Sequence, residues 1–290
     1  METKPLTTTA FFRLYPDDGT CLTHLFNTRF GQGFTCPSCE RPSNWFRIQA
    51  ERAYSCQWCG HHLHPTVGTP FERTRTPLQL WFYAIHLFTT TRHGVSAKEL
   101  QRQLGVTYKT AWRMAALIRE HMANVKIDET LTGGVKKGKH NRGSAAKTVV
   151  VGALERGGDV VCAVVPNQRR ATLEPFVTAN VQTGGNVHTD ELGSYRNLGA
   201  AGYRHATVNH GAEEYAYYDY RLAEVVSVNG IENFWRHLKC SINGTHTSVS
   251  PKYLGRYVKE FEYRFNRRNR PASMLPELLS TFRPLPQKAG

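Results

Sequence analysis

The spacing of apolar residues along the chain changes near residue 124. From 76 to 122, apolar residues recur every three or four positions, which is the period of helices with one buried face. Three helices are predicted: Ser96 can cap the second, and Thr107 can cap the third after a break at Gly105. A short helix, a turn with glycine and a longer helix is the layout of a helix-turn-helix, although many small helical bundles share it.

After residue 124, short runs rich in valine alternate with helical segments. The pattern predicts strands at 124–130, 147–156, 158–167, 184–191 and 203–210, and helices at 171–181, 192–202, 230–244 and 250–268. The Gly- and Lys-rich stretch at 132–147 is expected to be a loop. A hairpin of strands followed by alternating strands and helices predicts a mixed sheet with helices on its faces.

The helix predicted at 230–244 has a narrow apolar stripe. Its members are Ile231, Phe234, Trp235, Leu238 and Ile242. Glu232 and Lys239 lie at the margin of the stripe, seven residues apart, so that they share one line along the helix. Taken alone, this helix has a purely structural interpretation, because Asn229 could cap it and Arg236 stands at the spacing for an ion pair with Glu232.

Three carboxylates follow predicted strands. Asp128 and Asp190 end two of the strands, and Glu232 lies on the helix after the last one. Strand ends of an open α/β sheet converge at one edge, where such folds build their sites. Three clustered carboxylates repel one another unless a cation is present, and oxygen ligands suit Mg²⁺ or Mn²⁺. A single aspartate of this kind is usually structural, but the combination favours a two-metal site for phosphoryl transfer.

The charge balance narrows the class of partner. The chain has 37 basic and 23 acidic residues, a formal net charge of +14. Such a surplus predicts a polyanionic partner, and nucleic acid is the first candidate. Tyr108, Lys109 and Arg113 are expected to face outward from the third predicted helix, where a helix-turn-helix reads DNA bases. We find no run near the ~18 apolar residues of a membrane span and no signal-peptide core, so we expect a cytoplasmic protein without a membrane partner.

Four of the seven cysteines form two pairs. Each pair has the spacing Cys-x-x-Cys, and sixteen residues separate the pairs, which comprise Cys36, Cys39, Cys56 and Cys59. Two such turns supply a tetrahedral set of sulfur ligands with no open position, as in structural zinc sites. A redox pair is the alternative, and His61, His62 or His64 could substitute as ligands. The spacing predicts a zinc ribbon. Its partner is either DNA or protein, and the sequence does not choose between them.

Several stretches together resemble the DDE transposases of bacterial insertion sequences, in the ISXO-like subgroup with an N-terminal zinc ribbon. The similar stretches are GTPFERTRTPL, VKIDETLTGG, HTDELGSYRNL, NGIENFWRHLK and INGTHTSVSPKYLGRYVKEFEYRFNRR. The resemblance implies a ribonuclease-H-like catalytic domain behind the ribbon and the helix-turn-helix. The expected parts are an N-terminal segment at 1–18, the zinc ribbon at 19–75, the helix-turn-helix at 76–123, the catalytic domain at 124–270 and a C-terminal tail at 271–290.

The resemblance also implies roles for single residues. Asp128 and Asp190 match the two catalytic aspartates, Glu232 matches the third acid, and Lys239 matches the lysine that contacts the DNA end. Asn229 competes with Glu232 as third ligand, because similar proteins can use Asn or His there. The basic residues expected to hold phosphates, unless they form only a solvated face, are Lys136, Lys137, Lys139, Arg264, Arg267 and Arg268.

The implied reaction is Mg²⁺- or Mn²⁺-dependent DNA cleavage at insertion-sequence ends, followed by attack of the 3′-OH on target DNA. Its partners would be the terminal inverted repeats and target DNA, bound by a homodimer or larger assembly near the bacterial nucleoid. Two other functions fit the same residues. A DNA-binding regulator or inactive transposase derivative would bind without cutting, and a nuclease or resolvase would cut without joining.

Overall fold

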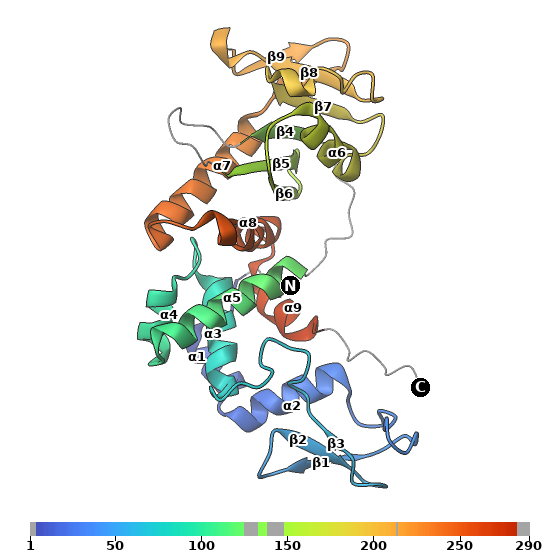
Figure 1. The fold of residues 1–290 in the computed structure, drawn as a ribbon, viewed down its shortest axis with the longest axis vertical. Coiled ribbons are helices and arrows are strands. Elements are labelled where there is room, and N and C mark those ends of the chain that lie inside the picture. The colour runs from blue at the N-terminus through green and yellow to red at the C-terminus, as the bar shows by residue number, and fades with distance from the viewer. Residues whose placement is uncertain (1–3, 125–132, 138–147, 213, 283–290) are drawn as a thin grey trace. The chain divides into compact units, whose positions relative to one another are not determined.

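The computed structural model describes residues 4–124, 133–137, 148–212 and 214–282. The chain divides into two compact units (Figure 1). The first unit comprises Met1–Val125 and Asn269–Gly290, and the second comprises Lys126–Arg268. Asp128 and Lys139 lie outside the described residues.

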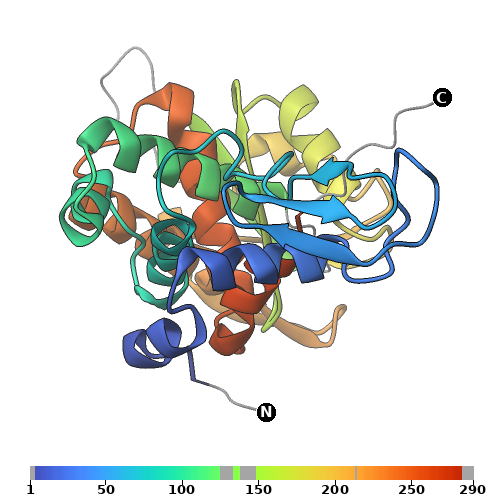
Figure 2. The ribbon, with the colours of Figure 1, turned by 90° about the horizontal axis from the view of Figure 1, so that it is seen from below.

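The first unit begins with two helices and the ribbon. These are α1 (Thr8–Leu14), α2 (Asp18–Arg29) and the antiparallel strands β1 (Trp45–Ile48), β2 (Ala53–Cys56) and β3 (His62–Leu63). Asp17 caps α2 by accepting a hydrogen bond from the Thr20 N–H at 2.7 Å. Figure 2 shows α2 along the three-stranded sheet, where the Phe26 ring stacks on the Tyr54 ring of β2 at 4.0 Å. The ribbon thus has a helical support that its cysteine spacing does not predict.

The three predicted helices between 76 and 122 are confirmed. They are α3 (Leu78–Thr90), α4 (Ala97–Leu104) and α5 (Tyr108–Asn124). Ser96 accepts from the Glu99 N–H at 3.1 Å, and Thr107 accepts from the Thr110 N–H at 3.2 Å, so both expected caps form. Gly105 ends α4 in the left-handed conformation, which a residue without Cβ adopts at little cost. Local sequence therefore fixes the two turns of this segment.

The C-terminal segment predicted as a tail instead helps to build the first unit. It forms a 3₁₀ turn at Pro271–Ser273 and helix α9 (Met274–Ser280). Leu278 and Leu279 of α9 are fully buried, and the Phe282 ring packs 5.3 Å from the Phe71 ring and 4.8 Å from the His121 ring. Apolar residues at helical spacing in this segment thus pack against residues far away in the sequence.

The second unit contains antiparallel and parallel strands in separate sheets, where the sequence predicted one mixed sheet. Strands β4 (Gly133–Lys137), β5 (Val149–Glu155) and β6 (Val160–Val165) are antiparallel in that order, and β7 (Asn186–Asp190) pairs in parallel with β8 (Arg204–Val208). Strand β4 lies beside β7 (Figure 1). The loop expected at 132–147 is corrected over Gly133–Lys137, whose backbone pairs with Val151–Glu155. This pairing over five residues overrides the weak strand propensity of glycine and lysine.

Helices pack on both faces of β5. Val151 and Ala153 face α6 (Arg170–Asn180), whereas Val150 and Leu154 pack with α7 (Asn229–Ser241) and α8 (Pro251–Asn266). Figure 1 shows α6 and α7 on opposite sides of this strand. The alternation of side chains along β5 therefore builds two cores, one on each face. The predicted helix at 192–202 is shorter than expected, since the structure has a 3₁₀ turn at Gly193–Tyr195.

A further hairpin precedes α7. It consists of β9 (Ala216–Asp219) and β10 (Glu224–Ser227), paired antiparallel, after a 3₁₀ turn at His210–Ala212. The sequence pattern did not predict these strands. A π-helical turn at Ile242–His246 connects α7 to α8. Within the described residues, none of the helices has the length and hydropathy to cross a membrane.

Candidate catalytic and metal sites

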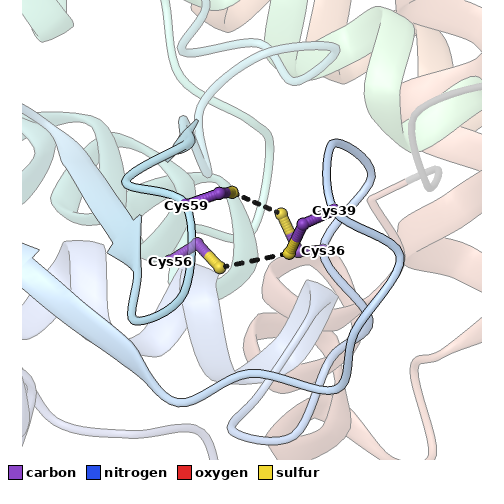
Figure 3. A group of neighbouring side chains, drawn as sticks. All are labelled: Cys36, Cys39, Cys56 and Cys59. Carbon is purple, nitrogen blue, oxygen red and sulfur yellow. Dashed lines mark hydrogen bonds between the residues drawn. The ribbon is translucent and has the colours of Figure 1, made fainter.

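The four paired cysteines meet in the ribbon (Figure 3). The Cys36 Sγ lies 3.6 Å from the Cys59 Sγ, and the Cys39 Sγ lies 3.8 Å from the Cys56 Sγ. All four sulfur atoms lie within 4.8 Å of one another. A tetrahedral zinc ion with Zn–S bonds of about 2.3 Å places its sulfur ligands about 3.8 Å apart. The predicted four-cysteine cluster is therefore confirmed, and its geometry fits a structural zinc ion.

Backbone hydrogen bonds shape each cysteine turn in the same way. The Glu40 N–H donates to the Cys36 carbonyl at 2.9 Å, and the Gly60 N–H donates to the Cys56 carbonyl at 3.1 Å. Both bonds span a Cys-x-x-Cys pair and close the turn behind its second cysteine. The sulfur pairs are thus held by local backbone structure, which lowers the cost of bringing four thiolates together.

The surroundings of Cys56 favour its thiolate form. Burial opposes ionisation, but hydrogen bonds from the Ser43 hydroxyl and from the backbone N–H groups of Cys59 and Trp58 outweigh burial and lower the pKa of Cys56 to about 6. The Ser43 Oγ lies 3.2 Å from the Cys56 Sγ. Because thiolates rather than thiols bind zinc, this thiol needs little energy to become a ligand near neutral pH.

Asp190 is the last residue of β7, as predicted for a strand-end carboxylate. It is half-buried, and its Oδ1 accepts a hydrogen bond from the Leu192 N–H at 3.3 Å. The nearby Tyr195 is buried, and burial together with the charge of Asp190 raises the pKa of its hydroxyl well above its ordinary value. The Tyr195 hydroxyl oxygen has no hydrogen-bond partner among the described residues.

Glu232 lies in the first turn of α7 and is half-buried, whereas Lys239 is exposed in the last turn. Asn229 is the first residue of the helix and is exposed. Val228 takes the cap position and makes no side-chain hydrogen bond, so the interpretation of Asn229 as the cap is wrong. The chain enters the helix one residue earlier than a capping box with Asn229 requires.

The predicted apolar stripe anchors α7 on the sheet. Its buried members are Ile231, Phe234, Trp235 and Leu238. The approach is closest at Gly152 of β5, where a Cβ atom would lie 2.8 Å from the Trp235 ring. Only glycine fits this position without a shift of the helix or of the ring. The tight packing fixes the height of Glu232 above the sheet.

The structure describes only part of the predicted carboxylate set. Asp190 and Glu232 form no group of three metal ligands with another His, Cys, Asp or Glu side chain of the described residues. Completion of the set depends on Asp128, which lies outside those residues. The oxygen-only character of the three side chains is what Mg²⁺ or Mn²⁺ would require.

The basic residues predicted to hold phosphates differ in exposure. Arg264 is buried 3.3 Å from Glu260, and Arg267 is buried with its guanidinium 3.9 Å from the Tyr263 ring centre. Arg264 is engaged within α8 and Arg267 at its C-terminal cap, which argues against phosphate contacts. Arg268 is exposed and donates to the Gly158 carbonyl in the β5–β6 turn at 2.9 Å. Of the predicted lysines, Lys136 and Lys137 lie on β4.

The predicted base-reading residues of α5 are exposed. Tyr108, Lys109 and Arg113 all face solvent, and the Lys98 Nζ lies 5.5 Å from the Tyr108 ring centre. Trp112 is also exposed, one turn after Tyr108 on the same face of α5. Sequence reasoning missed Trp112, although its spacing of four residues from Tyr108 was a usable signal.

Comparisons with known proteins bear on both parts of the chain. Residues 122–266 match the ISXO2-like transposase domain, and residues 16–62 match the transposase zinc-ribbon domain. An uncharacterized transposase-like protein of Haemophilus influenzae is 33% identical over 107 residues, which are 37% of this chain and 80% of the relative.

A second relative covers more of the chain. It is an uncharacterized protein in transposable element ISH50 of Halobacterium salinarum, 26% identical over 269 residues, which span 83% of this chain and 88% of the relative. No solved structure gives a significant match. The transposase domain model covers half of the chain, and the ribbon model covers the cysteine cluster. The chain therefore belongs to the family of transposases with an ISXO2-like DDE domain and a transposase zinc ribbon.

Proposed function

We propose that the chain is a DNA transposase that cuts DNA at the ends of an insertion sequence and joins the freed 3′-OH to target DNA. The observation that carries this proposal is the match of the ISXO2-like transposase domain across residues 122–266. That range includes Asp128, Asp190, Glu232 and Lys239, the residues that the sequence motifs single out.

The proposed metal ligands are Asp128, Asp190 and Glu232. The position of Asp190 at the end of β7 and of Glu232 on a rigidly packed helix supports this assignment. Two bound Mg²⁺ or Mn²⁺ ions would polarise the attacking oxygen and stabilise the leaving oxygen. Glu232 is preferred over Asn229 as third ligand, since Asn229 is an exposed amide at the helix start. Lys239 would contact a phosphate of the DNA end.

Two phosphoryl transfers make up the proposed reaction. In the first, a water oxygen attacks the phosphorus next to the element end, and the bond from phosphorus to the 3′ oxygen breaks. The element keeps a 3′-OH, and the flanking strand keeps a 5′-phosphate. In the second, this 3′-OH attacks a target phosphorus, and the target 3′ oxygen leaves as a hydroxyl. One phosphodiester replaces another, so the joining step needs no nucleotide cofactor.

The remaining elements have proposed roles in binding DNA. We assign the helix pair α4–α5 as a helix-turn-helix that reads the terminal inverted repeats through Tyr108, Lys109, Arg113 and the adjacent Trp112. The exposure of all four side chains supports this assignment. Arg268 is exposed, and we assign it a phosphate contact in addition to its bond to the Gly158 carbonyl. A ribonuclease-H-like fold for the second unit is supported by its neighbouring antiparallel and parallel strands and by the helices on both faces of β5.

A strand-transfer assay tests the proposal. The purified chain is incubated with Mg²⁺, labelled DNA that carries the element end, and a target plasmid. Joined products are expected, and they should disappear in the Asp190→Ala variant. Cleavage without joining would instead indicate a nuclease or resolvase, and a mobility shift without cleavage would indicate a regulator.

A further inference from the structure

A cavity of about 430 Å³ lies in the second unit beside the first half of β7. Its lining comes from the end of β5 and the turn after it, from the first residues of β7 and β8, from β10 and from the start of α7. Leu154, Val225 and Ile231 supply apolar wall, and several polar side chains line the rest. This volume and this mixture of groups are typical of small-ligand sites. Asp190 and Glu232 are not part of the lining, so the cavity is a separate candidate site.

A glutamate is fixed in the wall of this cavity. The Oε1 of Glu224 accepts a hydrogen bond from the Asn186 Nδ2 at 2.7 Å and lies 2.9 Å from the His188 Nε2. The Arg156 Nη2 lies 3.2 Å from the His188 Nδ1, and arginine can only donate, so the imidazole proton is on Nε2 and points to Glu224. Both bonds to Glu224 use Oε1. Its Oε2 has no hydrogen-bond partner in the described part of the chain and can accept from a ligand.

A second acceptor in the same wall also lacks a partner. The Asn186 Oδ1 is buried and makes no hydrogen bond to any residue that the structure describes. Its orientation is fixed, because the carboxylate of Glu224 only accepts and must face the Nδ2. Buried polar atoms without a partner are rare in folded proteins, since nothing offsets their lost hydration. The two side chains thus present neighbouring acceptors and call for a ligand with neighbouring donors.

Two exposed arginines in the lining favour an anion at the other end of the ligand. Arg156 uses only its Nη2 for hydrogen bonds to the cavity wall, and Arg204 uses its Nε, which donates to the Gly184 carbonyl at 3.3 Å. Their remaining guanidinium N–H groups make no hydrogen bond within the described residues. Such planar groups bind phosphate well. The other carboxylate of the lining, Glu155, folds back against Gly158 of the β5–β6 turn.

We propose that this cavity binds one guanine nucleotide, with the base edge on Glu224 and the phosphate on Arg156 and Arg204. Guanine carries two adjacent donors on its Watson–Crick edge, the N1–H and the 2-amino group, and these match the two unpaired acceptors. Adenine and cytosine have one amino group beside an acceptor nitrogen, which the carboxylate would repel. The apolar wall suits the faces of a base. Enzymes that take a base out of a duplex read this same edge in a fitted pocket.

The cavity lies next to residues of the proposed metal site. Side chains alternate along β7, so Asn186, His188 and Asp190 share one face of the strand. Glu232 directly follows Ile231 of the cavity wall. An unpaired guanine of the DNA strand would therefore be bound close to the phosphate that is cut, and this source of the nucleotide rests on the proposed function. A free mononucleotide offers the same chemistry.

Binding of guanine and adenine nucleotides without divalent metal tests the site. Isothermal titration calorimetry compares free dGMP, dAMP and dIMP, which lacks only the 2-amino group, and fluorescence anisotropy compares duplexes with one unpaired dG or dA at the element end. Guanine should bind about tenfold more tightly, because the other bases leave an acceptor unpaired. A preference only among free nucleotides identifies a soluble ligand, and one only in the duplex identifies the DNA strand. Equal affinities in both arms would overturn the proposal.

The variant Glu224→Gln tests the base contact. It turns the acceptor Oε2 into a donor and keeps Oε1 for Asn186 and His188. This variant should prefer adenine, whose N1 accepts, and so reverse the wild-type preference. Glu174→Gln on α6 is the control and should still prefer guanine. A Glu224→Gln protein with the wild-type melting temperature that still preferred guanine would refute the assignment.

The phosphate contact is tested by comparing dGMP with deoxyguanosine, which has no phosphate. The wild type should bind dGMP about tenfold more tightly, as expected for a charge-assisted contact. Arg204→Ala should lose most of this difference and keep the preference for guanine over adenine. Equal affinity of the wild type for both compounds would refute the role of the arginines. Asp190→Ala should behave as the wild type in all these measurements whether or not cleavage is observed, which separates the nucleotide site from the proposed activity.

Discussion

The side-chain amide of Asn266 makes to Val160 both hydrogen bonds that a neighbouring strand would make. The Val160 N–H donates to the Asn266 Oδ1 at 2.8 Å, and the Asn266 Nδ2 donates to the Val160 carbonyl at 2.8 Å. One turn earlier on α8, Glu262 accepts from the Cys162 N–H at 2.7 Å. Four helical residues rise about 6 Å, close to the rise of two strand residues, so the helix matches the strand. Helix α8 thereby covers the free edge of β6, which would otherwise invite pairing with another chain.

Replacement of Asn266 by alanine should destabilise the second unit. The variant leaves the Val160 N–H and carbonyl buried without partners, at a cost of about 1–3 kcal/mol each. Urea unfolding followed by circular dichroism measures the loss. Asn233→Ala on the exposed side of α7 serves as the control and should change the free energy of unfolding little. Equal stabilities of the two variants would contradict the role of Asn266 as an edge cover.

Glu262 should make the second unit less stable as the pH rises. Burial raises the pKa of Glu262 above its ordinary value, although Lys259 at 2.8 Å opposes the shift. The folded state then binds the proton more tightly than the unfolded state. The free energy of unfolding therefore falls as pH rises from the ordinary glutamate pKa through the raised value.

The variant Glu262→Gln removes this pH dependence and keeps an oxygen for the Cys162 N–H. Relative to the variant, the wild type should lose stability with rising pH in thermal melts. Glu174→Gln is a control of opposite sign, because hydrogen bonds from Arg170 and Asn197 lower the pKa of Glu174. There the wild type should gain stability relative to the variant as the pH rises. If the stability of the wild type relative to the variant changed with pH in the same direction in both pairs, the raised pKa of Glu262 would be refuted.

Removal of one cluster cysteine should release zinc. In Cys36→Ser three thiolates remain, and the ribbon loses the metal that ties its two turns together. Zinc content by atomic absorption should fall from about one ion per chain to near zero. Cys240→Ser, an exposed cysteine on α7, should retain the metal. In the wild type, acid should also release zinc, since protons compete for the thiolates. If the Cys36→Ser variant retained zinc, Cys36 would not be a zinc ligand.

Gly152→Ala should disturb α7 and lower cleavage while leaving DNA binding intact. The added Cβ would lie 2.8 Å from the Trp235 ring, and such overpacking costs about 1–3 kcal/mol. A displaced helix also carries Glu232 away from the proposed metals. Trp235→Leu removes the ring atoms that the added methyl group would meet, so the double variant should recover cleavage relative to Gly152→Ala. Failure of this rescue would mean that the clash is not what fixes the helix.

The sequence predicted the features that depend on residues close together in the chain. The caps at Ser96 and Thr107 depend on residues three positions away, and the cysteine turns depend on four-residue motifs. Distant pairings were not predictable in this way. Asn266 meets Val160 across 106 positions, and Arg264 is buried beside Glu260 rather than exposed to phosphates. The β9–β10 hairpin was missed because its outer face is as apolar as its inner face, which hides the alternation of a surface strand.

The third metal ligand can be identified by comparing two neighbouring variants. We expect Glu232→Ala to lower cleavage by about 10³-fold or more, because a lost ligand removes several kcal/mol of charge stabilisation in the transition state. Asn229→Ala should cut at close to the wild-type rate, since its amide is exposed at the start of α7. DNA affinity, measured by fluorescence anisotropy on the element end, should be unchanged in both. Normal cleavage by Glu232→Ala together with its loss in Asn229→Ala would transfer the role to Asn229. The third ligand would then be the first residue of α7, three positions before Glu232.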